Sequence, residues 1–542
     1  MKGTELISIL ILLIVILLMI KKSDNYFKNW QKILIGGGLS FFTIFELTGL
    51  GTSPDLFGDE AFNFYNSWTI AHYGVDAHLL HNAIYSISAG GQSVLYEWLC
   101  YPFMKLGGAS LAAYRFPMAI LTVISIILLV YSLYKDKVNA NIITGITLAL
   151  STAEWLLLYA HWAMDCNIVI PVFTLALDLI LLGKNRKGYN YIAIILITLI
   201  TYCYVGAWIV LPFLYIGIEV YLYKQGRFDK KDILISSVIS VILLIPILCY
   251  MMVQFMGVKP FKFLWFSVVP LSQTRASGSM ISFNGNIISS MIANAVSGIS
   301  QILTGNDGWL QESIPGFAVF YFMMFLIACY GIVRVIKLKD KKNPLIQLIN
   351  WISISILPMV LLVVPNFVHW SLVLLVLSVW SGIGLGFLFG KTGKKALVTK
   401  SVTLFIMLLS TINFTTFFFK DFPKAEIAAN QLPGYIINFK DSKTFMDRLN
   451  ELHVDRYYGV PIYNQNQPNA NVDLLCIEHP SPYKLKQFEE KYQNQLPQNI
   501  QDGSAAYIVP KDQVDKYPQF QSLPSKEMQM NYTKYIVYYN KN

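Results

Sequence analysis

ILIGGGLSFFTIFELTGLG occupies residues 33–51, and Gly58-Asp59-Glu60-Ala61 follows it a few residues later. The first stretch is an apolar run of the length that a membrane-spanning helix needs. The second places two adjacent carboxylates just beyond that run. One ionised carboxylate at a bilayer centre costs about 2.5–3.5 kcal/mol on insertion scales, so acids that gather beside a membrane indicate function. This junction predicts a membrane protein with chemistry at one of its faces.

The composition of the whole chain supports this interpretation. Of its 542 residues, 55% are hydrophobic and only 14% are charged, whereas soluble domains average about 25% charged residues. Long apolar runs bounded by lysines recur from Leu6 to Phe419, which predicts a polytopic helical membrane protein. The formal charge of +10 does not indicate nucleic acid, because the Lys and Arg residues lie in short connections and act as topology signals.

The apolar runs divide the chain into a membrane part and a polar tail. Residues 1–32 are expected to form an N-terminal membrane helix and a cytoplasmic linker, 33–419 a transmembrane domain, and 420–542 an external soluble α/β domain. A cleaved signal peptide is the alternative for the first helix, but its flanks favour an uncleaved one. About twelve segments are predicted to span, and these are 5–20, 33–51, 110–134, 140–160, 166–183, 189–206, 207–223, 233–255, 316–338, 345–364, 367–389 and 400–419.

The charges in the connections predict the orientation of these spans. Every second connection is basic, beginning with Lys21 and Lys22, and the positive-inside rule makes those connections cytoplasmic. The stretch 52–109 carries five acids against one lysine, so it is expected outside, together with the turn around Asp165, the loop 256–315 and the tail. The protein is thus expected in the cell membrane as a multi-pass protein with Asp59, Glu60 and Asp165 on its external face.

Three external pieces exceed the length of simple connectors. The first loop contains the aromatic stretch Leu95–Met104, which is expected to lie along the membrane surface as an interfacial helix. The loop 256–315 is rich in Gly, Ser and Asn, so it is expected to close over a site. The tail has strand-like runs at Arg456–Tyr463, Val472–Ile477, Ala505–Val509 and Lys534–Tyr539.

Acids on one face suit two kinds of chemistry. A carboxylate there can act as a general base toward an acceptor hydroxyl or amine, or it can hold a divalent metal. Asp59 and Glu60 as simple helix caps are the structural alternative. A metal site built from Glu60, His72, His78 and His81 is a weaker hypothesis, since the histidine spacings match no strong zinc signature.

Several motifs occur in the order seen in one enzyme family. These are Gly58-Asp59-Glu60-Ala61, Tyr114-Arg115-Phe116-Pro117, His161-Trp162-Ala163-Met164-Asp165-Cys166-Asn167 and the segment from Asp307-Gly308-Trp309 to Ser313-Ile314-Pro315-Gly316. As an ordered set they resemble the polyprenyl-phosphate-sugar-dependent glycosyltransferases of the C superfamily, which include protein O-mannosyltransferases and lipid A aminoarabinose transferases. The resemblance covers roughly residues 30–420.

The resemblance implies roles for particular residues. Asp59 would be the general base, Asp165 a second essential acid, and Glu60 a support for the first. Arg115, His161 and Asn167 would serve the substrate site. The family often has an arginine where this chain has His369, which could bind the lipid phosphate only when protonated or through a neutral hydrogen bond. Arg275, or Lys259 and Lys262, are the other candidates for the missing cation.

The resemblance also implies the reaction and its partners. The donor would be a polyprenyl-phosphate sugar in the membrane. The enzyme would transfer its sugar, with inversion, to a cell-envelope polymer, a glycolipid or a protein. No certain cofactor is implied beyond a possible divalent metal ion. A transporter or flippase of lipid-linked glycans is the alternative function, but it predicts midplane charges and inverted repeats, neither of which stands out in the sequence. A non-catalytic scaffold would leave the one-sided acids unexplained.

Overall fold

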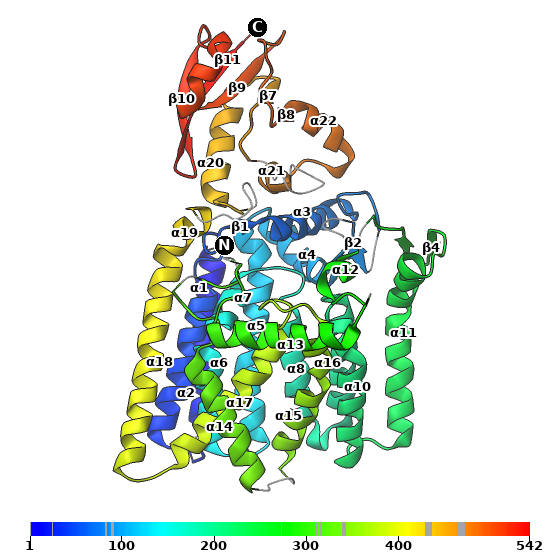
Figure 1. The fold of residues 1–542 in the computed structure, drawn as a ribbon, viewed down its shortest axis with the longest axis vertical. Helices are drawn as coiled ribbons and strands as arrows, with labels where there is room; N and C mark the ends of the chain where they lie inside the picture. The colour runs from blue at the N-terminus through cyan, green and yellow to red at the C-terminus, as the bar shows by residue number, and fades with distance from the viewer. Residues whose placement is uncertain are drawn as a thin grey trace.

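Helices form a bundle that carries a smaller, sheet-containing unit at one end, as the computed structural model shows (Figure 1). The structure describes all residues except 1, 24, 82–83, 88–90, 273, 284, 310–311, 315, 339–342, 429–435, 463–471 and 542. The bundle contains the helices α1 (Lys2–Lys22), α2 (Asn29–Glu46), α5 (Leu111–Lys135), α6 (Ala140–Ser151), α7 (Glu154–His161), α8 (Val169–Leu182), α9 (Lys187–Leu199), α10 (Ala207–Lys224), α11 (Lys230–Phe255), α14 (Phe322–Leu338), α15 (Pro344–Ser355), α16 (Leu357–Leu362), α17 (Ser371–Gly390) and α18 (Lys394–Lys420).

The number of spans differs from the twelve predicted. Among the described residues, eight helices are long and apolar enough to cross a membrane, or nine if the bent pair α6 and α7 is one span. That pair bends by 54° at the break after Ser151. Several predicted spans, such as 166–183 and 189–206, contain α-helices of only 14 and 13 residues. The protein is a multi-pass membrane protein, but the count of twelve is not confirmed.

Glycines on α17 allow the central helices of the bundle to approach closely. A Cβ on Gly382 would lie 2.4 Å from the Ile146 backbone of α6, and one on Gly386 would lie 2.6 Å from the Ile142 backbone. On another face of α17, a Cβ on Gly384 would lie 2.1 Å from the carbonyl oxygen of Ile327 in α14. Small residues at such spacing let helix backbones pack directly in a membrane. These contacts fix α6 and α14 on either side of α17.

The loop 256–315 contains a helix that was not predicted from the sequence. Helix α13 (Ile287–Thr304) begins at Asn286, whose side chain accepts a hydrogen bond from the Ser289 N–H. It runs across the bundle, roughly perpendicular to its neighbours (Figure 1). Its apolar residues Ile288, Ile292 and Val296 are 59–70% exposed, whereas Asn294 is buried. An exposed apolar stripe on a helix in this orientation is typical of an interfacial position.

The end of the bundle that carries α3 (Gly58–Tyr73) is called the site end below. Helix α4 (Leu95–Gly107) covers the predicted interfacial stretch, and α3 and α4 lie across the bundle beneath the sheet-containing unit (Figure 1). Two short hairpins flank them, β2 (Tyr85–Ser86) with β3 (Gln92–Ser93) and β4 (Phe261–Phe263) with β5 (Phe266–Val268). The short helix α12 (Arg275–Ser279) follows the second hairpin.

The tail contains a mixed sheet in the order β10-β11-β9-β7-β8. Strand β7 pairs in parallel with β8 and β9, and β11 pairs antiparallel with β9 and β10. The bounds are β7 (Arg456–Tyr458), β8 (Tyr492–Gln493), β9 (Ala505–Pro510), β10 (Ser525–Met530) and β11 (Thr533–Asn540), with helices α19 (Phe422–Ala428), α20 (Phe439–Asn450), α21 (Val472–Glu478) and α22 (Leu485–Lys491).

One predicted strand of the tail is wrong. Val472–Ile477 forms α21, and all six of these residues are buried. The periodicity of a short apolar run does not distinguish a strand from a buried helix. Here the run is buried between the sheet-containing unit and α3, and it forms a helix. The tail also reaches the first loop directly, because β6 (Ile436–Ile437) pairs antiparallel with β1 (Leu56–Phe57) just before α3.

Candidate active site

Glu60 is held in a fully buried ion pair at the start of α3. The Arg115 guanidinium donates from Nε to Oε1 at 2.7 Å and from Nη2 to Oε2 at 2.6 Å, and both side chains are 0% exposed. The Ala163 N–H also donates to Oε1, at 3.1 Å. Arg115 further donates to the Pro54 carbonyl oxygen at 2.7 Å. Glu60 thus ties together α3, α5 and the segment before Asp165, and its oxygens face protein partners.

Asp59 points differently from its neighbour. It lies in the first turn of α3, whose N-cap residue is Phe57, so neither acid is the capping residue. Its side chain is 20% exposed, and its Oδ2 lies 3.4 Å from Nη2 of Arg275. Adjacent residues on a helix project about 100° apart. This explains why one carboxylate is sealed in the protein while the other reaches the site.

Arg275 joins the two predicted acids. Its Nη1 donates to Oδ2 of Asp165 at 2.6 Å while its Nη2 faces Asp59. The three residues come from α12, from the segment between α7 and α8, and from α3. The structure therefore brings Asp59, Asp165 and Arg275 together, and the cation comes from the loop predicted to close over the site.

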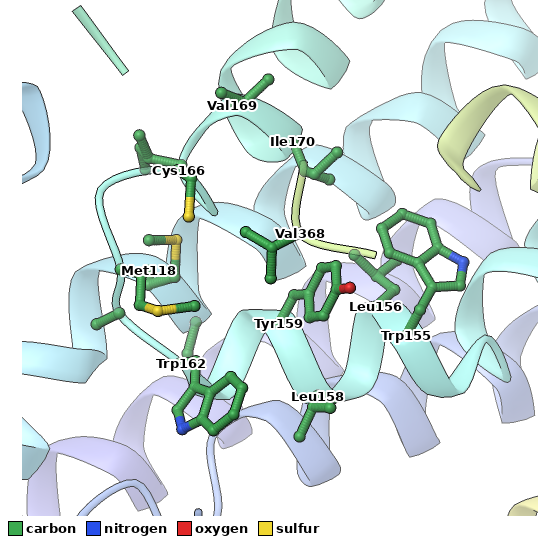
Figure 2. Close-up of a cluster of buried hydrophobic side chains, with 14 of the residues drawn as sticks. Met118, Trp155, Leu156, Leu158, Tyr159, Trp162, Cys166, Val169, Ile170 and Val368 are labelled. Carbon is green, nitrogen blue, oxygen red and sulfur yellow. The ribbon is translucent and has the colours of Figure 1, made fainter. Parts of the chain in front are cut away.

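Backbone contacts around the β2–β3 hairpin position the two acids. The Ser93 N–H donates to Asp165 Oδ2 at 2.9 Å, and the Gln92 side-chain amide donates to the Asp59 carbonyl oxygen at 3.0 Å. The residues on either side of Asp165 in the sequence belong to a cluster of buried side chains that includes Tyr159, Trp162 and Cys166 (Figure 2). Trp162 is 0% exposed, so it belongs to this core. The segment that carries Asp165 thus adjoins a packed core, and the hairpin supplies one backbone donor to Asp165 and one side-chain donor to the backbone of Asp59.

His161 and Asn167 lie beside the site but bind the backbone. The His161 ring nitrogens lie 3.0 Å from the Ser53 carbonyl oxygen and 2.9 Å from that of Phe45. The Asn167 amide donates to the carbonyl oxygens of Tyr159 and Trp162, at 3.2 and 3.1 Å. Both side chains are buried. Their geometry favours a role in shaping the segment that carries Asp165, and their assignment to substrate binding stays a prediction.

His369 lies at the site end, between α16 and α17. Its Nδ1 is 2.9 Å from the Val364 carbonyl oxygen, and its ring stacks on Tyr204 with centroids 5.4 Å apart. Burial lowers the pKa of His369 to about 4, although the hydrogen bond to the Val364 carbonyl oxygen acts in the opposite direction. The imidazole is therefore neutral near pH 7 and supplies no positive charge, and its assignment to substrate binding stays a prediction. Lys259 and Lys262 are exposed around the β4–β5 hairpin.

The histidines of the first loop do not assemble with Glu60. His72 stacks on Trp68, with ring centroids 4.9 Å apart, and its Nδ1 lies 3.0 Å from the Trp68 carbonyl oxygen. Within the described part of the chain, no three His, Cys, Asp or Glu side chains gather in a way that could hold a metal ion. The site built from Glu60, His72, His78 and His81 therefore lacks structural support.

Two buried acids near the site escaped the sequence analysis. Glu312 accepts from the Asn366 side-chain amide at 3.3 Å and from the Val368 N–H at 3.4 Å. Burial first, and the charge of Asp307 second, raise the pKa of Glu312 well above its usual value. Burial likewise raises the pKa of Glu97, which is 0% exposed. Glu312 stands inside one of the quoted motifs, so its position there was the available signal.

Comparisons with known proteins support the fold. No protein-family model matches the chain, and no curated protein matches it. Similar solved structures include ArnT from Cupriavidus metallidurans in the apo state and the same protein bound to undecaprenyl phosphate. The identities are 11% and 12%, each with a TM-score of 0.51 and with 94% of this chain and 97% of the other covered. The chain therefore has an ArnT-like fold along almost its whole length.

Proposed function

We propose that this protein transfers a sugar from a polyprenyl-phosphate donor to an acceptor at the external face of the cell membrane, with inversion at the anomeric carbon. The observation that carries the proposal is the convergence of Asp59 and Asp165 on Arg275, three residues from distant parts of the chain. The ArnT-like fold adds support, since one similar structure holds undecaprenyl phosphate. External acids on a membrane boundary suit a substrate that arrives through the lipid.

The reaction needs a base and a countercharge. Asp59 takes the proton of the acceptor hydroxyl or amine while that group attacks the anomeric carbon. The bond from this carbon to the phosphate oxygen breaks, and polyprenyl phosphate leaves with the electron pair. A positioned guanidinium stabilises charge that develops on the leaving phosphate. Arg275 is suited to this role, because His369 is neutral near pH 7.

Arg275 must change partners for this to happen. In the present structure its guanidinium neutralises Asp59 and Asp165. A donor phosphate competes for the same guanidinium and, when it binds, frees Asp59 to act as a base. Asp165 stays fixed by the Ser93 N–H and so holds the acceptor or the guanidinium in place. Glu60 acts as a positioning residue through its buried pair with Arg115.

The test is sugar transfer by the full chain in proteoliposomes that contain a radiolabelled polyprenyl-phosphate sugar. We expect Asp59→Asn and Asp165→Asn to reduce transfer by at least about a hundredfold, the scale of general-base loss. Asp447→Asn is the matched control, because Asp447 is exposed on α20 and 60% accessible. Unimpaired transfer in both site variants would refute the assignment.

The same vesicles distinguish the alternative function. A flippase moves the lipid-linked sugar between leaflets without breaking the bond to phosphate. If the variants leave the sugar on its lipid but change its leaflet distribution, the protein is a transporter. The acceptor remains to be identified from envelope polymers, glycolipids and surface proteins by mass spectrometry of a deletion strain, in which the transferred sugar should be lost.

A further inference from the structure

An apolar groove runs between α1 and α5, far from the site end. Its volume is about 380 Å³, and it is lined by residues around Leu18 on α1 and around Ile124 on α5. Lys22 and Tyr131 also line it. The groove is therefore hydrocarbon-like along its length and polar where the two helices reach their basic ends.

Protein side chains leave this groove open. Helix α1 packs on the bundle through Leu12 and Ile16, which are 8% and 1% exposed. On the groove side, Leu18 is 60% exposed, Val15 42% and Ile124 39%. In a membrane such a surface meets lipid chains rather than water. A chain that lies in the groove contacts two helices at once, whereas one elsewhere on α1 contacts a single helix.

Cations gather where the groove ends. The Lys135 ammonium lies 5.4 Å from the ring centroid of Tyr131, and the Lys137 ammonium lies 5.5 Å from that of Tyr134. The Tyr134 hydroxyl donates to the Lys22 carbonyl oxygen at 3.4 Å, so the ends of α1 and α5 are joined here. Asp136 contributes a negative charge nearby, but the Lys184 ammonium faces it at 3.5 Å.

We propose that this groove binds an anionic phospholipid of the membrane, with one acyl chain between α1 and α5 and its phosphate at Lys22 and Lys135. The lysines at the end of the groove attract the anionic headgroup, and the apolar residues that line the groove contact the acyl chain. Basic pockets between helices on the cytoplasmic side bind anionic headgroups in this way. The positive-inside rule places this end in the cytoplasm, where the anionic lipid is available. The inference is independent of the transfer reaction.

Native mass spectrometry of the full-length protein tests the proposal. Phosphatidylglycerol and phosphatidylcholine with identical chains are titrated in detergent. We expect phosphatidylglycerol to bind about thirtyfold more tightly, the factor that two lysines near an anionic lipid surface would give. Lys22→Gln with Lys135→Gln should abolish this preference, and Val15→Trp, which fills the groove, should weaken both lipids. Lys231→Gln is the control, since Lys231 is exposed on α11.

Each outcome decides the question. Loss of the preference in the double variant but not in the control supports a specific site. An unchanged preference in the double variant overturns it. An equal loss in Lys231→Gln overturns it as well, because the basic surface would then act as a whole. If Val15→Trp binds both lipids as tightly as the wild type does, the acyl chain does not lie in the groove.

Discussion

Replacing Glu60 with Gln is expected to destabilise the fold before it affects chemistry. Glu60 and Arg115 are 0% exposed and share two hydrogen bonds of 2.7 and 2.6 Å. Removing one partner of a buried ion pair leaves the other charge without compensation, which costs about 3–5 kcal/mol. Glutamine keeps the shape of the side chain and one acceptor oxygen, so the loss is that of charge rather than of volume.

The neighbourhood of Arg115 places the expected value at the lower end. Arg115 also donates to the carbonyl oxygens of Leu50, Pro54 and Asp55, and these bonds survive the substitution. We therefore expect a loss of about 3 kcal/mol.

Unfolding in mixed micelles by increasing fractions of SDS measures this loss. Glu60→Gln combined with Arg115→Met should recover part of the stability, because both charges are then absent. Glu60→Asp is the matched control, because aspartate keeps the negative charge on a shorter side chain. If Glu60→Gln unfolds like the wild type yet loses sugar transfer, Glu60 acts on the substrate and its role as a buried anchor is refuted.

Three further predictions concern titration and helix packing. Asp55→Asn should stabilise the protein relative to the wild type, and increasingly so as pH rises from 5 to 8. Burial raises the pKa of Asp55 to about 8 in the folded protein, so in this pH range the carboxyl ionises in the unfolded chain and its ionisation favours unfolding. The gain should reach a few kcal/mol in SDS unfolding, on the order of magnitude that such a pKa difference gives. His369→Gln should make the stability of the protein less sensitive to acid. The pKa of His369 is lowered to about 4 in the folded protein, so the wild type loses stability as pH falls below about 6.5. The melting temperature of the variant should therefore drop less between pH 7 and 5 than that of the wild type. Gly382→Val should lower the melting temperature sharply, since a Cβ there would lie 2.4 Å from the Ile146 backbone, whereas Gly37→Ala, with open space around it, should not.

The sequence predicts that the acids lie at the same end of the bundle, because the topology assigns each connection between spans to one side of the membrane. Basic connections put Asp59 and Asp165 at the same end, and the loop with Arg275 at that end as well. What topology cannot supply is the direction of each side chain. Asp59 and Glu60 are neighbours in sequence, yet Glu60 is sealed against Arg115 and Asp59 reaches Arg275. That difference depends on the helical turn of α3, which begins at Gly58.

The errors have similar physical causes. Val472–Ile477 is a short apolar run whose state is decided by burial against α3, which no local pattern contains. Helix α13 was overlooked because Gly, Ser and Asn dominate the composition around it, although its apolar residues recur at helical spacing. The count of twelve spans stays a prediction, because apolar composition does not reveal where a helix breaks, as at the 54° bend between α6 and α7.

The pairing of β6 with β1 has a consequence for the order in which the molecule is built. The first acid of the site is synthesised early, but the segments that lie against its helix come late in the chain. The Cys476 thiol donates to the Ala61 carbonyl oxygen, and the Tyr65 hydroxyl donates to that of Pro480 at 2.9 Å. Helix α3 and the strand before it therefore gain their full set of partners only after Ile436–Ile437, Cys476 and Pro480 have been synthesised. A nascent chain that ends before Ile436 would hold a bundle whose site end still lacks these contacts.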